Sequence, residues 1–198
     1  MKTELGVALR MTLVTLVLTG LGYPVLITGL AQLFFPSRAN GSLVEIDGRV
    51  VGSELIGQGF GRPDYFQPRP SAAGADGYDA TASSGSNLGP PSRKLRERVA
   101  ADVARLSGEN PAAPGPVPIE LVTTSGSGLD PHVSPEAARW QIPRVAAARG
   151  LSVADVEALV AIRVEGPTFG FLGEPRVNVL LLNLDLDRRF GRPRGGPA

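Results

Sequence analysis

A stretch of 25 residues without a charged side chain, residues 11–35, constrains this chain more than any other feature. Wound as an α-helix, it would be about 37 Å long, against about 30 Å for the hydrocarbon core of a bilayer. Its thirteen Leu, Val, Ile or Phe side chains favour insertion by about 4–8 kcal/mol. The sequence therefore predicts one transmembrane helix over residues 11–35, preceded by a short flank at residues 1–10.

A cleaved signal peptide is the alternative interpretation of this stretch. The apolar region of a signal peptide is about 7–15 residues long and ends in small residues at the cleavage site. Here the apolar run is longer, and it ends in Leu33, Phe34, Phe35 and Pro36. We therefore expect a retained, single-pass anchor, and a secreted binding module that starts near Pro36 stays the alternative.

One face of the expected helix carries small side chains. On a helical wheel these residues share an arc of about 100°. They are Thr12, Thr15, Thr19, Gly22 and Gly29. Small residues let a second helix approach closely in lipid, so this arc predicts a docking face for partner helices.

The orientation of the anchor is weakly encoded. Lys2 and Arg10 precede the span, and Arg38 and Arg49 follow it. The positive-inside rule then leans slightly towards a cytoplasmic N-terminus. We expect the soluble domain on the extracytoplasmic side of the cell (inner) membrane.

Residues 36–187 indicate a soluble domain of the α+β class, with short strands and about three helices. Asp47-Gly48 between two β-prone runs predicts a tight hairpin over residues 43–51. The helices are expected to begin at the caps Ser92, Ser134 and Ser152. Pro143 is expected to break or kink the second of them.

The other residues of the domain are predicted to form loops and strands. Residues 57–92 form a long loop whose aromatic side chains are expected to pack down. Strands are expected at residues 119–123 and 177–186, and residues 188–198 read as a disordered basic tail.

The composition excludes several chemistries. There is no cysteine and only one histidine, His132, so His and Cys metal clusters are excluded, and we assign no metal site. No phosphate-binding P-loop motif and no G-x-S-x-G motif is present. The net charge of +1 gives no support to a nucleic-acid partner. Asp185 and Asp187 alternate on the expected last strand, where a solvated strand end is favoured over a weak cation site.

Two loops are rich in small polar residues, and their backbone N–H groups are candidates for anion binding. The first loop supplies Ser84, Gly85, Ser86, Asn87 and Gly89, and the second supplies Ser125, Gly126, Ser127, Asp130 and His132. A serine hydrolase built from Ser127, His132 and Asp130 is the alternative, but neighbours on one short loop rarely reach the geometry of a triad.

These loops also carry a family resemblance. Matching stretches occur in family order over nearly the whole chain: GSELIGQ at 52–58, YFQPRPSA at 65–72, SGSNLGP at 84–90, LVTTSGSGLDPH at 121–132, PRVA at 143–146, RGL at 149–151, VNVL at 177–180 and LN at 182–183. On these stretches the chain resembles the C subunit of the Kdp-type potassium-transporting P-type ATPase.

The resemblance implies an accessory, non-catalytic subunit of an ATP-driven potassium uptake complex. Its implied partners are a channel-like A subunit that passes K⁺, a P-type ATPase B subunit that binds ATP and Mg²⁺, and a small F subunit, all in the lipid bilayer. The family is described as a catalytic chaperone that raises the ATP affinity of the ATPase subunit, and the Ser84–Gly89 loop has been likened to the signature loop of ABC transporters. With the domain outside the cell, it would instead guard the external K⁺ entrance.

Overall fold

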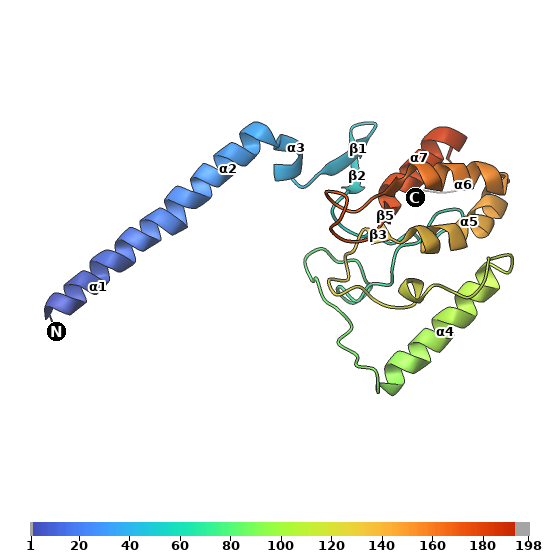
Figure 1. Ribbon diagram of the computed structural model, residues 1–198, viewed down its shortest axis with the longest axis horizontal. Coiled ribbons are helices and arrows are strands. Elements are labelled where there is room, and N and C mark those ends of the chain that lie inside the picture. The colour runs from blue at the N-terminus through green and yellow to red at the C-terminus, as the bar shows by residue number, and fades with distance from the viewer. Residues whose placement is uncertain (1, 193–198) are drawn as a thin grey trace. The chain divides into compact units, whose positions relative to one another are not determined.

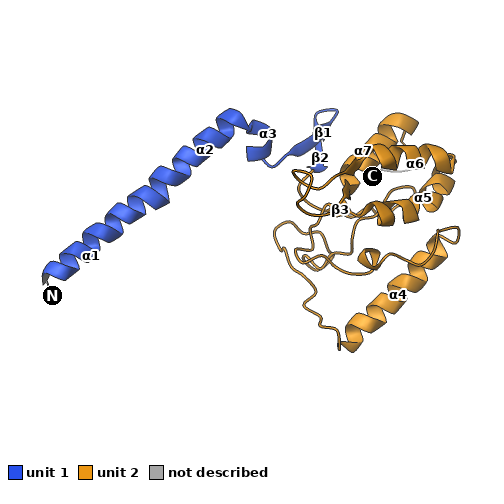
Figure 2. Ribbon diagram, in the orientation of Figure 1, with its two compact units in different colours: residues 1–53 blue, residues 54–198 orange. Residues whose placement is uncertain are grey.

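The computed structural model describes residues 2–192 and divides the chain into two units, residues 1–53 and 54–198 (Figure 2). The first unit begins with helix α1 (Lys2–Thr15), a π-helical stretch (Leu16–Gly22) and helix α2 (Tyr23–Phe34), which continue one another (Figure 1). Over Thr3–Phe34 this helix is long and apolar enough to cross a membrane. The predicted helix is confirmed, and it begins earlier than residue 11.

The π-helical stretch Leu16–Gly22 lies directly before a proline. Pro24 has no N–H to donate to the carbonyl of Gly20, and its ring crowds that carbonyl. A wider turn relieves this conflict, and the N–H of Tyr23 accordingly donates to the carbonyl of Leu18, five residues back. Because each residue of a π-helix turns through a smaller angle, the predicted face of small residues is displaced across this stretch.

A short helix and a hairpin complete the first unit. Helix α3 (Pro36–Ala39) follows α2, and strands β1 (Leu43–Ile46) and β2 (Arg49–Ser53) pair antiparallel. Asp47 and Gly48 both have positive φ, 51° and 75°, as the favoured two-residue hairpin turn requires. The predicted hairpin is confirmed.

Three helices of the second unit begin at the predicted serine caps. They are α4 (Arg93–Glu109), α5 (Pro135–Arg149) and α6 (Val153–Ile162). In each, the Oγ of the preceding serine accepts a hydrogen bond from the backbone N–H three residues on. These caps satisfy N–H groups that have no partner within the helix.

The C-terminal apolar run folds differently from the prediction. Only β5 (Arg176–Asn178) is a strand, and helix α7 (Val179–Phe190) follows it at once. Asn178 starts the helix, because its Oδ1 accepts from the N–H of Leu181. β5 lies between β3 (His132–Val133) and β4 (Val164–Glu165), both antiparallel to it. An unbroken apolar run has no period that separates a buried strand from a buried helix.

The aspartates of that run therefore lie on a helix. Asp185 pairs with Arg163, and Asp187 pairs with Arg149 at 2.8 Å. The prediction that they alternate on a strand with a solvated end is wrong. Their carboxylates serve as ion-pair partners inside the fold.

Other boundaries also differ from the predictions. α5 continues through Pro143, so the break named in the prediction does not occur; the carbonyl that loses its donor belongs to Arg139, an exposed residue. Residues 119–123 contain a 3₁₀ turn (Ile119–Leu121) in place of a strand. Residues 188–190 close α7, while residues 193–198 of the expected tail lie outside the described residues. The α+β class is confirmed; within residues 2–192, five helices, α3 to α7, follow the membrane helix, where about three were predicted.

The long loop before α4 packs into the core, as its aromatics predict. Phe66 is fully buried. The side-chain amide of Asn183, on α7, accepts from the Phe66 N–H at 2.8 Å and donates to the Phe66 carbonyl at 2.9 Å. Gln141, on α5, makes the same pair of contacts with the backbone of Gln67. Two amide side chains thus take the place of a neighbouring strand and fix the loop.

Candidate functional site

The two loops predicted to carry function lie against each other. The N–H of Ser84 donates to the carbonyl of Ser127 at 2.9 Å, and the Oγ of Ser83 donates to the same oxygen. A Cβ added at Gly85 would lie 3.0 Å from the carbonyl oxygen of Gly126. The two loops are therefore joined backbone to backbone, and a side chain at residue 85 would require the Gly126 backbone to shift by a few tenths of an ångström.

Gly128 makes the tightest contact between these loops. Its φ of +70° favours glycine, and a Cβ there would lie 2.5 Å from the Ser84 carbonyl oxygen and 2.8 Å from the Ala73 nitrogen. Neither backbone atom can move aside like the end of a flexible side chain. Glycine at this position therefore permits three segments to meet.

A third segment, from the long loop, completes the arrangement. The Oγ of Ser71 donates to the Gly128 carbonyl at 2.6 Å and accepts from the N–H groups of Ala73 and Tyr78. The N–H of Gly57 donates to the carbonyl of Leu129 at 2.7 Å. We call this assembly, made of residues 57, 69–78, 83–89 and 123–132, the loop face.

Tyr78 is a partly buried member of the loop face. Its hydroxyl donates to the carbonyl of Arg69 at 2.8 Å. Burial raises the pKa of Tyr78 to about 12, because the phenolate would lose its hydration. The side chain therefore stays neutral and acts as a structural donor.

Asp130 is the charged centre of the loop face. One carboxylate oxygen lies 3.2 Å from the Arg69 guanidinium, and the other accepts from the His132 N–H at 3.0 Å and lies 3.7 Å from His132 Nδ1. Burial alone would raise the pKa of Asp130, but hydrogen bonds from His132 and the charge of Arg69 outweigh it and lower the pKa.

A polar pocket of about 250 Å³ opens beside Asp130. Three carboxylates, two guanidinium groups and His132 line it; the carboxylates belong to Glu120, Asp130 and Glu174. Glu120 accepts from the N–H and the Oγ of Ser134. Glu174 is exposed and makes no ion pair within residues 2–192. Glu174 is thus the carboxylate of this pocket that remains available to a cation or a partner.

Replacing Asp130 with Asn is expected to lower the free energy of unfolding by about 1 kcal/mol at pH 7. A carboxylate with a lowered pKa stabilises the fold above its unfolded pKa, 3.8 here, and this contribution is lost as pH falls through the folded pKa. The difference between wild type and Asp130→Asn should therefore shrink below about pH 4. Urea unfolding of the detergent-solubilised chain, followed by fluorescence of the single tryptophan, measures it; a difference independent of pH would contradict the assignment.

The remaining predicted loop residues are placed as follows. Ser125 is buried, Asn87 has a φ of +52°, and the carbonyl of Gly89 accepts from the N–H of Ser92. Because Ser84 already donates to Ser127, only part of this loop's backbone is open to an anion. Ser86, two residues after Ser84, is partly buried.

The hydrolase alternative gains no support from this geometry. The Oγ of Ser127 accepts from the N–H of Leu129. The ring of His132 faces Asp130, and among the described residues no hydrogen bond joins it to a serine hydroxyl. A general base must contact its nucleophile, and here the histidine and the aspartate stabilise a turn.

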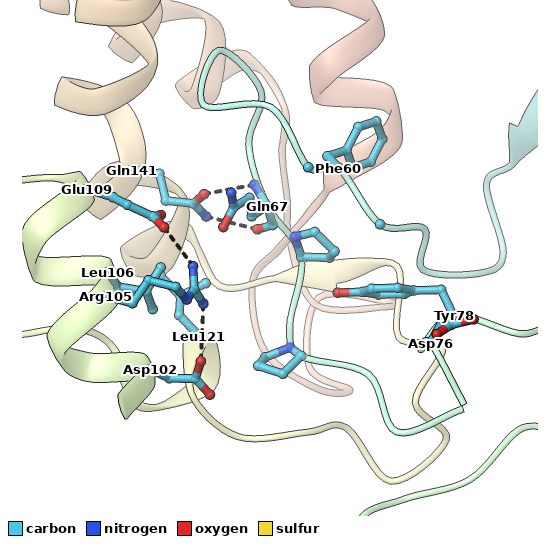
Figure 3. A pocket seen from close by; sticks show the side chains of 14 residues that line it. Phe60, Gln67, Asp76, Tyr78, Asp102, Arg105, Leu106, Glu109, Leu121 and Gln141 are labelled. Atoms are coloured by element: carbon cyan, nitrogen blue, oxygen red, sulfur yellow. Dashed lines mark hydrogen bonds and ion pairs between the residues drawn. The ribbon is translucent and has the colours of Figure 1, made fainter. Parts of the chain in front are cut away.

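A larger cavity of about 540 Å³ lies between α4 and the long loop (Figure 3). Asp102 and Glu109 point into it, and both bind Arg105, at 3.2 and 3.0 Å. Gln141 and Gln67 also line it, and the N–H of Gln67 donates to the side-chain oxygen of Gln141. Asp76 also lines it, so three carboxylates against the one guanidinium of Arg105 leave this cavity net negative, as is the pocket beside Asp130.

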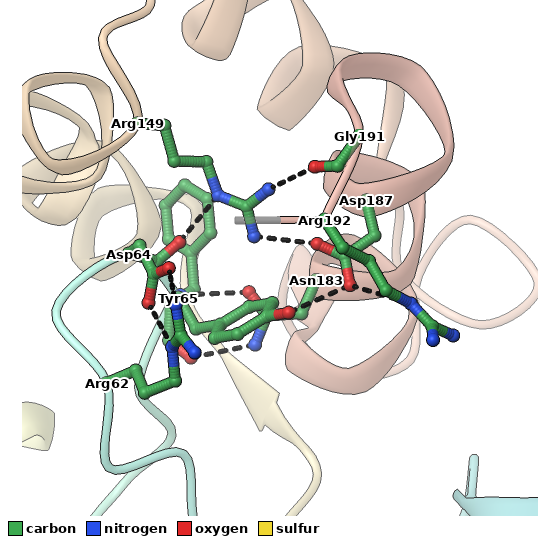
Figure 4. A network of polar contacts seen from close by, with 9 residues as sticks. Arg62, Asp64, Tyr65, Arg149, Asn183, Asp187, Gly191 and Arg192 are labelled. Carbon is green, nitrogen blue, oxygen red and sulfur yellow. Dashed lines mark hydrogen bonds and ion pairs between the residues drawn. The ribbon is translucent and has the colours of Figure 1, made fainter. Parts of the chain in front are cut away.

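A polar network holds the base of the long loop to α7 (Figure 4). The Arg149 side chain is only 3% exposed; it pairs with Asp187 at 2.8 Å and donates to the carbonyl of Asp64 at 2.7 Å. Its guanidinium lies 4.7 Å from the centre of the Tyr65 ring, and the Tyr65 hydroxyl donates to Asp187. Hydrogen bonds from Arg62 lower the pKa of Asp64. This network is structural.

Residue-by-residue reasoning on the sequence missed several members of the site. Gly57, Arg69 and Ser71 lie within the family-like stretches but carry no local signal of their partners. Asn183 was detectable as an amide inside an apolar run, and Gln141 as an amide between Trp140 and Ile142, because a buried amide must find hydrogen-bond partners.

The helix-docking candidates all lie on the membrane helix. Thr12 and Thr15 are on α1, Thr19 and Gly22 are in the π-helical stretch, and Gly29 is on α2. All five are exposed, which leaves this surface open to other helices.

Comparison with known proteins identifies the family. Residues 5–188 match the family model described as KdpC, K⁺-transporting ATPase, c chain. A potassium-transporting ATPase KdpC subunit of Myxococcus xanthus is 70% identical over 93% of this chain and 87% of its own length. Proteins of the same name from Koribacter versatilis and Nitratidesulfovibrio vulgaris are 55% and 58% identical, over 94% and 90% of this chain and 95% and 92% of their own lengths. The chain therefore belongs to the KdpC family and is an accessory subunit, not catalytic alone, of the K⁺-transporting ATPase complex.

Proposed function

We propose that the loop face guards the external K⁺ entrance of the complex. The anchor crosses the inner membrane with its N-terminus in the cytoplasm, and the domain rests outside on the channel-like A subunit. The observation that carries this proposal is the assembly of distant segments into one surface bordered by the pocket of Glu120, Asp130 and Glu174. Carboxylates beside an entrance raise the local concentration of cations.

The effect on ATP is, in this proposal, indirect. The P-type ATPase B subunit holds ATP and Mg²⁺ on the cytoplasmic side, and a single span cannot place this domain on both faces of the membrane. The N–H of Ser84 is already donated to the carbonyl of Ser127, which removes one of the donors that a phosphate would need. A raised ATP affinity then follows from linkage, because a contact that favours one state of the complex also favours the ligands of that state.

The membrane helix supplies the second part of the proposed assembly. We propose that the small-residue face of Thr12, Thr15, Thr19, Gly22 and Gly29 packs on helices of the A subunit, with the small F subunit nearby. Close helix approach in lipid depends on such residues. The π-helical stretch sets the angle between the two halves of this face.

The substitution Glu174→Gln tests the entrance function in the assembled ATPase. Removing this charge is expected to raise the K⁺ concentration that half-saturates ATP hydrolysis about two- to five-fold, because the local attraction for cations is weaker. The KM for ATP should stay the same. ATPase activity measured across K⁺ and ATP concentrations gives both values.

Glu157→Gln is the matched control, since Glu157 is an exposed carboxylate on α6 outside the pocket. It should leave both values unchanged. An unaltered K⁺ half-saturation in Glu174→Gln would contradict the entrance function. A change confined to the KM for ATP would favour a direct nucleotide role.

A further inference from the structure

The turn between β4 and β5 exposes large apolar side chains. Phe169 is 84% exposed, Phe171 74% and Leu172 50%. Residues 166–173 contain no charged side chain. We call these eight residues the apolar tip.

The apolar tip has a fixed shape. Thr168 and Leu172 exchange two backbone hydrogen bonds of 2.9 Å, and the N–H of Gly170 donates to the carbonyl of Pro167 at 2.9 Å. Phe169 has a φ of +54°, which is uncommon for a bulky residue and persists only where the surroundings impose it.

The base of the apolar tip is braced as well. Arg176 on β5 pairs with Glu165 on β4 at 3.2 Å, and β4 and β5 are adjacent strands. A braced turn that holds two phenyl rings in water is unfavourable for an isolated domain. Rigid, exposed aromatics of this kind are typical of the central contacts of protein interfaces.

We propose that the apolar tip inserts into an apolar socket on the extracytoplasmic surface of the membrane subunit that passes K⁺. This inference rests on the proposed function, since it needs the domain outside the cell and next to that subunit. Glu174, Pro175 and Arg176, which directly follow the tip, also line the polar pocket. The tip is thus continuous with the loop face and would hold it in position over the entrance.

A protein socket is favoured over the lipid surface by charge. Glu165 is paired with Arg176, so Glu174 supplies the net charge beside the tip, and a carboxylate gains no attraction to anionic lipids. Segments that bind the bilayer interface usually carry Lys or Arg beside their apolar residues. Here the two arginines that flank the tip are each engaged by a carboxylate, Arg163 by Asp185 and Arg176 by Glu165.

The absence of cysteine from the chain permits a direct test. Phe171→Cys, labelled with an environment-sensitive fluorophore, is assembled into the complete ATPase in liposomes. We expect blue-shifted emission in the complex that spin-labelled lipids do not quench, and water-like emission from the isolated chain in detergent. Quenching by the lipids would overturn the proposal in favour of the bilayer, and water-like emission in the complex would overturn it outright.

A double variant and a control variant test how much the apolar tip contributes to assembly of the complex. Phe169→Asn with Phe171→Ser removes both rings, and Asn tolerates the positive φ at residue 169. Retention of this chain by an affinity-tagged A subunit is expected to fall at least tenfold, as for the loss of interface hot spots. The control Ile162→Ser removes another exposed apolar side chain, 70% exposed at the end of α6, and should be retained like wild type.

The outcomes separate this inference from the function on which it rests. An unchanged midpoint of urea unfolding, read from Trp140, establishes that the double variant folds. Retention equal to wild type in that folded variant would overturn the role of the tip alone. Failure of the wild-type chain to co-purify with the A subunit would instead overturn the proposed function.

Discussion

Asn183→Leu is expected to lower the free energy of unfolding of the domain by about 3–5 kcal/mol. Leu has a similar volume but can neither donate nor accept a hydrogen bond. The substitution would leave the N–H and the carbonyl of Phe66 without the partners they have at 2.8 and 2.9 Å. Both groups are buried with Phe66, so water cannot replace the lost contacts.

Urea unfolding of the detergent-solubilised chain measures this effect. The chain has one tryptophan, Trp140, which is buried in the core, so its fluorescence follows the domain and not the membrane helix. Arg189→Ala, at an exposed position of the same helix, is the control and should change stability by less than about 0.5 kcal/mol. A loss below about 1 kcal/mol in Asn183→Leu would contradict the role given to the amide.

Gly128→Ala is expected to cost about 3 kcal/mol or more and to disrupt the loop face. Two effects add at this position. The positive φ is unfavourable for alanine, and the new Cβ would lie 2.5 Å from the Ser84 carbonyl oxygen and 2.8 Å from the Ala73 nitrogen. The three segments cannot stay together unless their backbones shift.

Gly115→Ala separates these two effects. Gly115 has a similar φ, +78°, but a Cβ there meets no atom within 4 Å, so only the conformational cost of about 1 kcal/mol remains. The difference between the two variants in the same urea experiment gives the cost of the clash. Equal losses in both variants would show that the close approach of the segments at Gly128 contributes nothing.

Local features of the sequence were sufficient for much of the secondary structure. The caps Ser92, Ser134 and Ser152 and the turn Asp47-Gly48 act within three or four residues, so their effect does not depend on the rest of the fold. The membrane helix is predictable for a similar reason, because length and apolarity decide it.

The predictions failed where two structures fit the same residues. The run at 177–186 suits a buried strand or a buried helix equally well, and pairing of β5 with β3 and β4 over only a few residues left the rest to form α7. Pro143 was compatible with a continuous helix because the carbonyl that it leaves unpaired belongs to exposed Arg139. Strand pairing with segments distant in sequence decided the first case, and the exposure of the helix at Arg139 decided the second.

The sequence by itself determined that the chain carries a membrane helix followed by an α+β domain, and its ordered motifs pointed to the family. Only the tertiary structure decided that Gly57, Ser71, Gly85 and Gly128 belong to one surface. Their contacts join backbone atoms of segments far apart in the chain. Backbone N–H and C=O groups are the same in every residue except proline, which lacks the N–H, so no side-chain pattern records which of them will meet.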